Sequence, residues 1–231
     1  MEKIDSASPT FKIPINVSCI DKLMNGGLES GIISEIYGEG GSGKTNFCMQ
    51  FALSALRLGK TVIYFDTEGF SVERLSQVTG ENLDLIKNLL LYRISSLEDQ
   101  DLTMLRLPKM VEKISNLGLI IIDSFTEYFR LEKPAEGQSR SGNIQRQLSS
   151  LNLVCSKFHI PVLITNQIYQ DIDSGNLQPF GGFIIDHVMK AIFNIQKIGS
   201  GKRRISVVKH RSIKEDNYTD FRITDFGLSC E

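Results

Sequence analysis

The 231-residue sequence lacks the features that mark membrane, secreted and zinc-binding proteins. No apolar run approaches the roughly 20 residues that span a bilayer, and the first residues lack the charged-then-apolar order of a signal peptide. The four cysteines, Cys19, Cys48, Cys155 and Cys230, are widely spaced and include no C-x-x-C pair. We therefore expect a cytoplasmic protein without a membrane segment, whose thiols are buried and reduced and bind no zinc.

A large excess of charge of either sign is also missing. The 26 Lys and Arg residues and the 27 Asp and Glu residues nearly cancel, so overall charge does not draw the protein to nucleic acid. Any DNA-binding surface must therefore be local. Internal repeats and low-complexity segments are absent too, and the length suits one domain with a large core.

Strand-like and helix-like segments alternate along most of the chain, in the order typical of βαβ units around a parallel sheet. The predicted strands are residues 32–37, 61–65, 89–94, 119–122 and 161–165, and the predicted helices are residues 46–58, 72–78, 97–115 and 144–158. After Gly182 the pattern changes, because residues 188–196, 204–209 and 221–223 alternate as antiparallel strands do. We expect an α/β fold with a mainly parallel twisted sheet, helices on both faces and antiparallel C-terminal strands.

What the sequence does contain is a complete phosphate-binding loop, G-x-x-x-x-G-K-[ST]. Its residues are Gly38, Glu39, Gly40, Gly41, Ser42, Gly43, Lys44 and Thr45, followed by Asn46 at the start of a predicted helix. The glycines let backbone N–H groups turn toward phosphates, and the helix N-terminus favours negative charge. Lys44 would reach the β- and γ-phosphates and the Thr45 hydroxyl would bind Mg²⁺. The loop predicts a nucleoside triphosphate with Mg²⁺, without separating ATP from GTP.

Three polar residues follow predicted strands, at the sheet edge where α/β proteins bind ligands. Asp123 comes directly after residues 119–122, where a carboxylate can hold Mg²⁺ through water, although it can also cap a helix. Glu68 can orient a water molecule in line with the γ-phosphate, or can simply form a salt bridge in a loop. Gln167 can sense the γ-phosphate, or can make an ordinary surface hydrogen bond.

Residues 189–214 contain cations and no acidic residue. Lys202, Arg203 and Arg204 lie at a predicted turn, where they could contact a DNA backbone. Lys209 and Arg211 are two residues apart on a predicted strand and could reach the γ-phosphate of a neighbouring subunit. The simpler alternative is the solvated face of a hairpin.

Several of these segments resemble the RecA/RadA recombinase family. The run G-G-L-E-S-G-I-I-S-E-I-Y-G at residues 26–38 leads into the phosphate-binding loop, and F-D-T-E-G-F at 65–70 and I-T-N-Q at 164–167 also match. The resemblance covers the chain from about Val17 onward, so we expect a RecA-type ATPase core at residues 17–231 after a short segment at residues 1–16. Because there is no room for an N-terminal helix-hairpin-helix domain, the chain is most similar to the RadB branch, archaeal paralogues of RadA.

The resemblance implies roles for individual residues. Glu68 corresponds to the catalytic carboxylate, Asp123 to the metal-side aspartate and Gln167 to the switch glutamine, while Lys44 and Thr45 bind phosphate and Mg²⁺. Two further assignments concern the base and the DNA. Arg74 matches an arginine near the adenine, and residues 130–142 match the first DNA-binding loop, with Arg130, Lys133 and Arg140 as its cations.

The resemblance also implies a function. RadB proteins are described as accessory factors of recombination and repair that bind ATP and DNA, hydrolyse ATP weakly and do not exchange strands. Expected partners are single-stranded or branched DNA, a RadA-type recombinase, a Holliday-junction resolvase and further copies of the chain. Two departures support this prediction, because the second loop, residues 168–182, contains Asp171 and Asp173 without Lys or Arg, and no Phe-x-x-Ala polymerisation motif is found.

Three alternatives stay open at this point. A DNA-stimulated ATPase that forms its own filament and exchanges strands would share the same ATPase motifs. A KaiC-like signalling ATPase would share the fold and the Lys-x-Arg pair without binding DNA. A small-molecule kinase is disfavoured, since Glu68 would activate water where a kinase must exclude it.

Overall fold

The computed structural model describes residues 11–80, 82–133, 136–137, 139–170 and 177–231. It has one large sheet in the order β12-β11-β10-β9-β3-β7-β6-β4-β5, with β8 paired to β7. The strands are β3 (Ile33–Gly38), β4 (Thr61–Asp66), β5 (Leu89–Arg93), β6 (Leu117–Asp123), β7 (Val162–Gln170), β8 (Leu177–Pro179), β9 (Ala191–Lys197), β10 (Lys202–His210), β11 (Tyr218–Thr224) and β12 (Gly227–Cys230). Strands β5, β4, β6, β7, β3 and β9 run parallel, and β9 to β12 pair antiparallel. The predicted α/β fold with an antiparallel C-terminal extension is confirmed.

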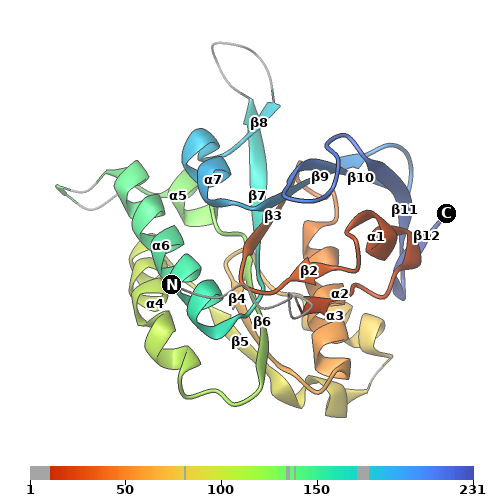
Figure 1. Ribbon diagram of the computed structural model, residues 1–231, viewed down its shortest axis with the longest axis horizontal. Coiled ribbons are helices and arrows are strands. Elements are labelled where there is room, and N and C mark those ends of the chain that lie inside the picture. Colours follow the sequence, from red (N-terminus) through yellow and green to blue (C-terminus); the bar gives the residue numbers. More distant parts are fainter. Residues whose placement is uncertain (1–10, 81, 134–135, 138, 171–176) are drawn as a thin grey trace, which may run out of the picture.

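Helices cover both faces of the sheet (Figure 1). They are α1 (Ser18–Leu23), α2 (Lys44–Arg57), α3 (Val72–Thr79), α4 (Leu97–Val111), α5 (Glu127–Leu131), α6 (Arg140–Phe158) and α7 (Gly182–Val188), with a 3₁₀ helix at Leu83–Asn88. Successive strand residues enter opposite cores: Val62 and Tyr64 pack toward α2, while Ile63 and Phe65 pack toward α4 and α6. Burial on both faces explains why these strands read as continuous apolar runs.

Several element ends differ from the sequence prediction: α6 begins at Arg140 rather than at residue 144, and β11 spans Tyr218–Thr224 rather than residues 221–223. Helix α4 ends at Val111 rather than continuing to residue 115, because Lys113 and Ile114 donate their N–H groups to carbonyls three residues earlier and tighten the chain. Helix α7 occupies residues 182–188 and includes Val188, which the sequence pattern places in the following strand at residues 188–196. Short apolar segments do not separate helix from strand by pattern alone.

Ile13 and Ile15, near the start of the described residues, are part of the core. Strand β1 (Lys12–Ile13) pairs antiparallel with β2 (Leu28–Glu29), and the side chains of Ile13 and Ile15 are fully buried. The described part of the segment before residue 17 is therefore packed against the domain. Among the described residues, no helix has the length and hydropathy to cross a membrane.

The expectation of four reduced thiols is wrong for two of them. Cys19 on α1 and Cys230 on β12 form a disulfide across a sequence separation of 211 residues. Helix α1 packs on β11 and β12, which brings Cys19 beside Cys230, and the spacing of cysteines in a sequence carries no sign of that contact. Cys48 and Cys155 are buried and free as expected, and burial raises the pKa of the Cys155 thiol to about 12.

Candidate nucleotide site at the carboxyl edge of the parallel strands

The phosphate-binding loop connects β3 to α2 and lies against Ile195 of β9 and Ile223 of β11. Glycine is required at both of its ends. A Cβ on Gly38 would lie 2.4 Å from the Ile195 carbonyl oxygen, and Gly43, with φ of +110°, would place a Cβ 2.6 Å from the Ile223 side chain. Such close approaches leave room only for backbone. The loop geometry thus depends on β9 and β11 as well as on β3.

Lys44 lies over this loop. Its ammonium donates to the carbonyl oxygens of Gly38 at 2.8 Å and Glu39 at 3.1 Å. Burial lowers the pKa of Lys44, and the charges of Glu68 and Asp123 act in the opposite direction. The predicted phosphate-binding lysine is therefore buried at the site with two acidic groups nearby.

Asp123 ends β6 and is held by two neutral donors. The Tyr64 hydroxyl donates to Oδ2 at 2.7 Å, and the Thr165 hydroxyl donates to Oδ1 at 2.6 Å. The carboxyl group is buried, with 3% of the residue exposed. Both donors were missed from the sequence, although Thr165 belongs to the same I-T-N-Q segment as Gln167. They hold the carboxylate in place at the carboxyl end of β6.

Glu68 and Gln167 were predicted separately and meet in the structure. The Gln167 side-chain amide donates to Glu68 Oε1 at 2.7 Å. Asp66 shapes the loop that carries Glu68, because its carboxylate accepts the N–H groups of Glu68, Gly69 and Phe70. Burial raises the pKa of the Glu68 carboxyl, and the hydrogen bond from Gln167 partly offsets this shift.

Lys44, Glu68 and Gln167 line a cavity of about 440 Å³, whereas Asp123 is not among its lining residues. It is lined by Gly40, Gly41, Gly43, Lys44, Thr45, Asn46, Glu68, Gln167, Gly201, Arg203 and Ile223. A larger cavity of about 830 Å³ lies between α1 and the chain that follows β10, but no phosphate-binding residue lines it. The chemistry of the lining, rather than the size, favours the smaller cavity for a nucleotide.

The site residues fit a triphosphate with Mg²⁺. The hydroxyl of Ser42 is buried and has no hydrogen-bond partner among the described residues, so a polar group is available inside the loop. Thr45 and Asp123 supply oxygen donors, the kind that Mg²⁺ prefers. The space beside Gly40 is open, because a Cβ built on this residue would have no atom within 4 Å.

Arg74 connects three elements at the rim of the cavity. Its guanidinium donates to the Asn46 side chain at 3.0 Å and to the backbone oxygens of Thr224 at 2.7 Å and Asp225 at 2.9 Å. Ser71 caps the helix that carries Arg74 by accepting the Arg74 N–H. The arginine assigned to the adenine thus holds the β11–β12 turn beside the start of α2.

The basic residues of the C-terminal strands contact their own chain. Arg204 binds Asp220 in a bidentate pair at 2.7 and 2.9 Å and lies 4.0 Å from the centre of the Tyr218 ring. Lys202 pairs with Glu231 at 2.6 Å. Arg203 differs from both, because its guanidinium donates to carbonyl oxygens of the phosphate-binding loop rather than to an acid. Contact of this triplet with DNA stays a prediction.

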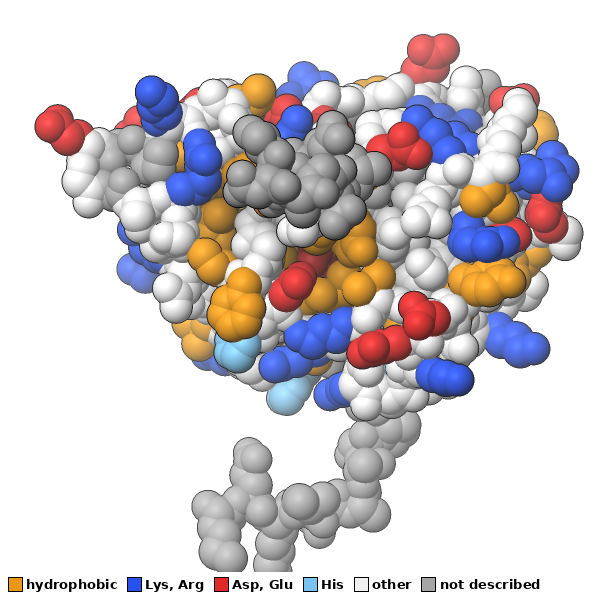
Figure 2. Space-filling view, turned by 90° about the horizontal axis from the view of Figure 1, so that it is seen from above, with side chains coloured by type: hydrophobic (Ala, Val, Ile, Leu, Met, Phe, Trp, Pro, Cys, Tyr) orange, Lys and Arg blue, Asp and Glu red, His pale blue; other side chains and the backbone are white. Residues whose placement is uncertain are grey.

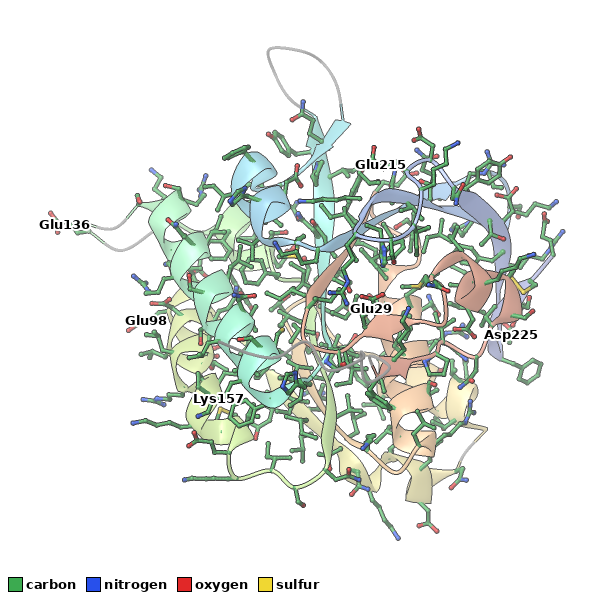
Figure 3. All side chains as sticks on the ribbon, viewed as in Figure 1. Glu29, Glu98, Glu136, Lys157, Glu215 and Asp225 are labelled. Carbon is green, nitrogen blue, oxygen red and sulfur yellow. A yellow bond between two sulfur atoms is a disulfide. The ribbon has the colours of Figure 1, made fainter. Side chains whose placement is uncertain are left out.

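Lys209 and Arg211 reach different elements. Lys209 donates to the Asp186 carbonyl oxygen on α7, and Arg211 donates to Glu29 on β2 at 2.7 Å. Strand β10 ends at His210, so Arg211 lies outside it and strand alternation does not place the two cations on one face. Figure 3 shows Glu29 on β2 in the middle of the molecule.

The first loop carries exposed cations. Arg130 forms an ion pair with Glu127 at 3.1 Å, Lys133 is exposed, and Arg140 lies 5.8 Å from the centre of the Phe180 ring. Tyr169 and Phe180 pack edge to face with centres 6.0 Å apart, whereas Asp171 and Asp173 lie outside the described residues. Seen from above, this face shows cations and acids interspersed rather than one basic patch (Figure 2).

Comparison with known proteins places these findings in a family. The Rad51 family model matches residues 8–230. The chain is 51% identical to the DNA repair and recombination protein RadB of Thermoplasma volcanium, covering 100% of this chain and 97% of the relative, and 52% identical to that of Thermoplasma acidophilum, covering both chains fully. A crystal structure of the RadB recombinase superposes with a TM-score of 0.82 at 29% identity, covering 95% of this chain and 99% of the other. The chain belongs to the Rad51/RecA family, in its archaeal RadB branch of DNA repair and recombination proteins.

Proposed function

We propose that the chain binds ATP with Mg²⁺ in the 440 Å³ cavity and acts as a DNA-binding accessory factor of recombination, with slow hydrolysis and no strand exchange of its own. The observation that carries the proposal is the hydrogen bond between Gln167 and Glu68. It joins the residue that would orient water to strand β7, from which the second loop departs. A nucleotide that alters this pair would thereby act on β7 and on the second loop.

The residues of the site divide the chemistry among them. Lys44 would bind the β- and γ-phosphates, and Thr45 with Asp123 would hold Mg²⁺, which neutralises phosphate charge when bound. Glu68 would accept a proton from the attacking water, and its raised pKa suits that task. Gln167 would hold Glu68 in place through their 2.7 Å hydrogen bond.

Slow hydrolysis is expected from the positions of Lys209 and Arg211, the two cations that could reach the γ-phosphate of a neighbouring subunit. Cations supplied by a neighbouring subunit can accelerate phosphoryl transfer by about 10³–10⁵. Lys209 and Arg211 are bound to Asp186 and Glu29 of their own chain, so reaching a neighbour would require breaking these contacts. We propose that ATP serves mainly as a conformational ligand.

For DNA we propose the first loop as the contact surface. Its cations are Arg130, Lys133 and Arg140. The surface ion pair between Arg130 and Glu127 contributes little to stability, so a DNA phosphate can replace Glu127 as the partner of Arg130. Single-stranded or branched DNA, a RadA-type recombinase, a Holliday-junction resolvase and other copies of the chain are the proposed partners, in the cytoplasm.

Steady-state ATP turnover, titrated with single-stranded DNA at fixed Mg²⁺ and salt, tests the proposal. We expect a low rate that DNA changes little and that Glu68→Gln abolishes. Lys44→Ala should remove the thermal stabilisation by ATP while leaving the melting midpoint without nucleotide unchanged. A steep rise of turnover with DNA would favour a self-assembling strand-exchange motor instead, and unchanged ATP affinity in Lys44→Ala would refute the nucleotide site.

The DNA surface has its own test. Replacing Arg130 and Arg140 by Ala should weaken DNA binding and reduce the slope of log K against log salt by roughly 0.7 for each lost phosphate contact on a single strand. Glu136→Gln, in the same exposed loop, serves as a control of opposite charge change. An unaltered salt slope in the double variant would remove the first loop from the DNA surface.

A further inference from the structure

The carbonyl oxygens of the phosphate-binding loop are held by cationic side chains over five consecutive residues. Lys44 donates to the oxygens of Gly38 and Glu39. Lys197 donates to that of Gly40 at 2.6 Å. Arg203 donates to those of Gly41 at 3.3 Å and Ser42 at 2.9 Å. Only Lys44 belongs to the phosphate-binding motif.

Lys197 and Arg203 reach the loop from the hairpin formed by β9 and β10. Strand β9 is the parallel neighbour of β3, so the end of β9 lies beside the end of β3, where the loop begins. Arg203 is fixed from its other side as well, since its NH1 donates to the carbonyl oxygens of Gly199 and Lys202.

The contacts have a direct consequence for the peptide groups of the loop. A peptide has its N–H and C=O on opposite sides, so a carbonyl held by a cation turns the N–H of the same peptide away from that cation. Backbone N–H groups that point into such a loop are those that bind phosphate. Hydrogen bonds from charged donors are about twice as strong as neutral ones, which makes this orientation persistent.

We propose that Lys197 and Arg203 are positioning residues that hold the phosphate-binding loop in its phosphate-receiving conformation from within the same chain. The inference rests on the proposed nucleotide binding at this site. It assigns Arg203 to nucleotide affinity rather than to DNA, because its donors face the loop. The β9–β10 hairpin thereby sets how tightly a nucleotide is held.

The experiment compares Lys197→Gln, Arg203→Gln and the double variant with the wild-type chain. Arg222→Gln is the matched control: Arg222 lies on β11 of the same sheet and binds Glu231 rather than the loop. Dissociation constants and release rates for ATP and ADP are measured with Mg²⁺, together with the melting midpoint in the absence of nucleotide. Arg203→Lys tests rescue by a cation of different shape.

We expect Lys197→Gln, which loses one charge-assisted hydrogen bond to the loop, to raise the dissociation constant of both nucleotides roughly tenfold. Arg203→Gln loses two such bonds and should raise it by at least as much. The rise should appear in the release rate, with the nucleotide-free melting midpoint unchanged and with partial recovery in Arg203→Lys. A merely structural role would lower the midpoint and leave the affinity intact.

Wild-type affinity in Arg203→Gln and Lys197→Gln would overturn the inference while leaving the proposed function standing. Absence of nucleotide binding by the wild-type chain would instead refute the proposed function itself. A loss of DNA affinity in Arg203→Gln with unchanged ATP affinity would return Arg203 to the DNA surface and also overturn the inference.

Discussion

The parallel and antiparallel halves of the sheet hold their charged residues in opposite ways. In the parallel half, three acids have neutral hydrogen-bond donors: Asp123 has Tyr64 and Thr165, Glu68 has Gln167, and Glu35 has Asn166. In the antiparallel half, Lys202 and Arg204 each pair with an acid of their own chain, and Arg211 pairs with Glu29.

This difference in hydrogen-bond partners indicates which half of the sheet gains from binding a charged ligand. Neutral donors orient a carboxylate without cancelling its charge, so the parallel half can still gain from a bound cation. Lys202, Arg204 and Arg211 are already neutralised, so an external phosphate must compete with an existing acid at each of them. Lys197 and Arg203 differ from these three cations, because they donate to carbonyl oxygens of the phosphate-binding loop.

Glu35→Gln should have the largest effect, by removing the buried acid of the parallel half. Burial raises the pKa of Glu35 to about 7, the Asn166 amide opposes this shift, and Asp186 on α7 adds to it. Because the native state holds the proton more tightly than the unfolded state, wild-type stability falls as pH rises from about 4.5 to about 7. We expect the variant to be more stable at pH 8 by on the order of 3 kcal/mol and nearly equal at pH 4.5.

Urea unfolding across this pH range measures the effect. Glu136→Gln is the control, since Glu136 is exposed and points away from the body of the molecule (Figure 3). Parallel stability curves for Glu35→Gln and the wild-type chain would show that Glu35 carries no unfavourable charge in the native state.

How far the sequence predicts the site differs between the same two halves. Asp123, Glu68 and Gln167 could be found because a residue after a buried parallel strand must lie at the ligand edge. The same rule does not state that Glu68 and Gln167 meet, since pairing of loops depends on side-chain packing. Arg203 was placed on a DNA-facing turn, whereas hairpin register turns it onto the phosphate-binding loop. The sequence around a basic residue does not show which acid or carbonyl oxygen its side chain will bind.

Glu29→Gln should have a smaller effect of opposite direction. Burial raises the pKa of Glu29, but hydrogen bonds and charges from Lys12 and Arg211 outweigh burial and leave it below the ordinary value. The stabilisation is therefore present above about pH 4.5 and is lost as pH falls through the lowered pKa. Because Arg211 is half exposed, we expect a loss of only about 2 kcal/mol at pH 7, below the range for fully buried pairs.

The measurement is again urea unfolding, now at pH 7 and pH 3. Lys157 and Glu112 form an exposed pair that provides a control, and Glu112→Gln should change stability little. A difference between Glu29→Gln and the wild-type chain that does not shrink at pH 3 would show that packing, rather than charge, holds β2 to Arg211.

The smallest expected effect concerns DNA, and it tests whether the antiparallel half is neutralised by its own acids. Asp220 binds Arg204 through both carboxylate oxygens, so Asp220→Asn should free the guanidinium for an external phosphate. We expect a modest gain in affinity for single-stranded DNA and a salt slope steeper by up to about 0.7, one added phosphate contact. Adding Arg204→Ala should cancel that gain. If the steeper slope survived removal of Arg204, the change in net charge alone would explain it, and Asp220 would not be what keeps Arg204 from DNA.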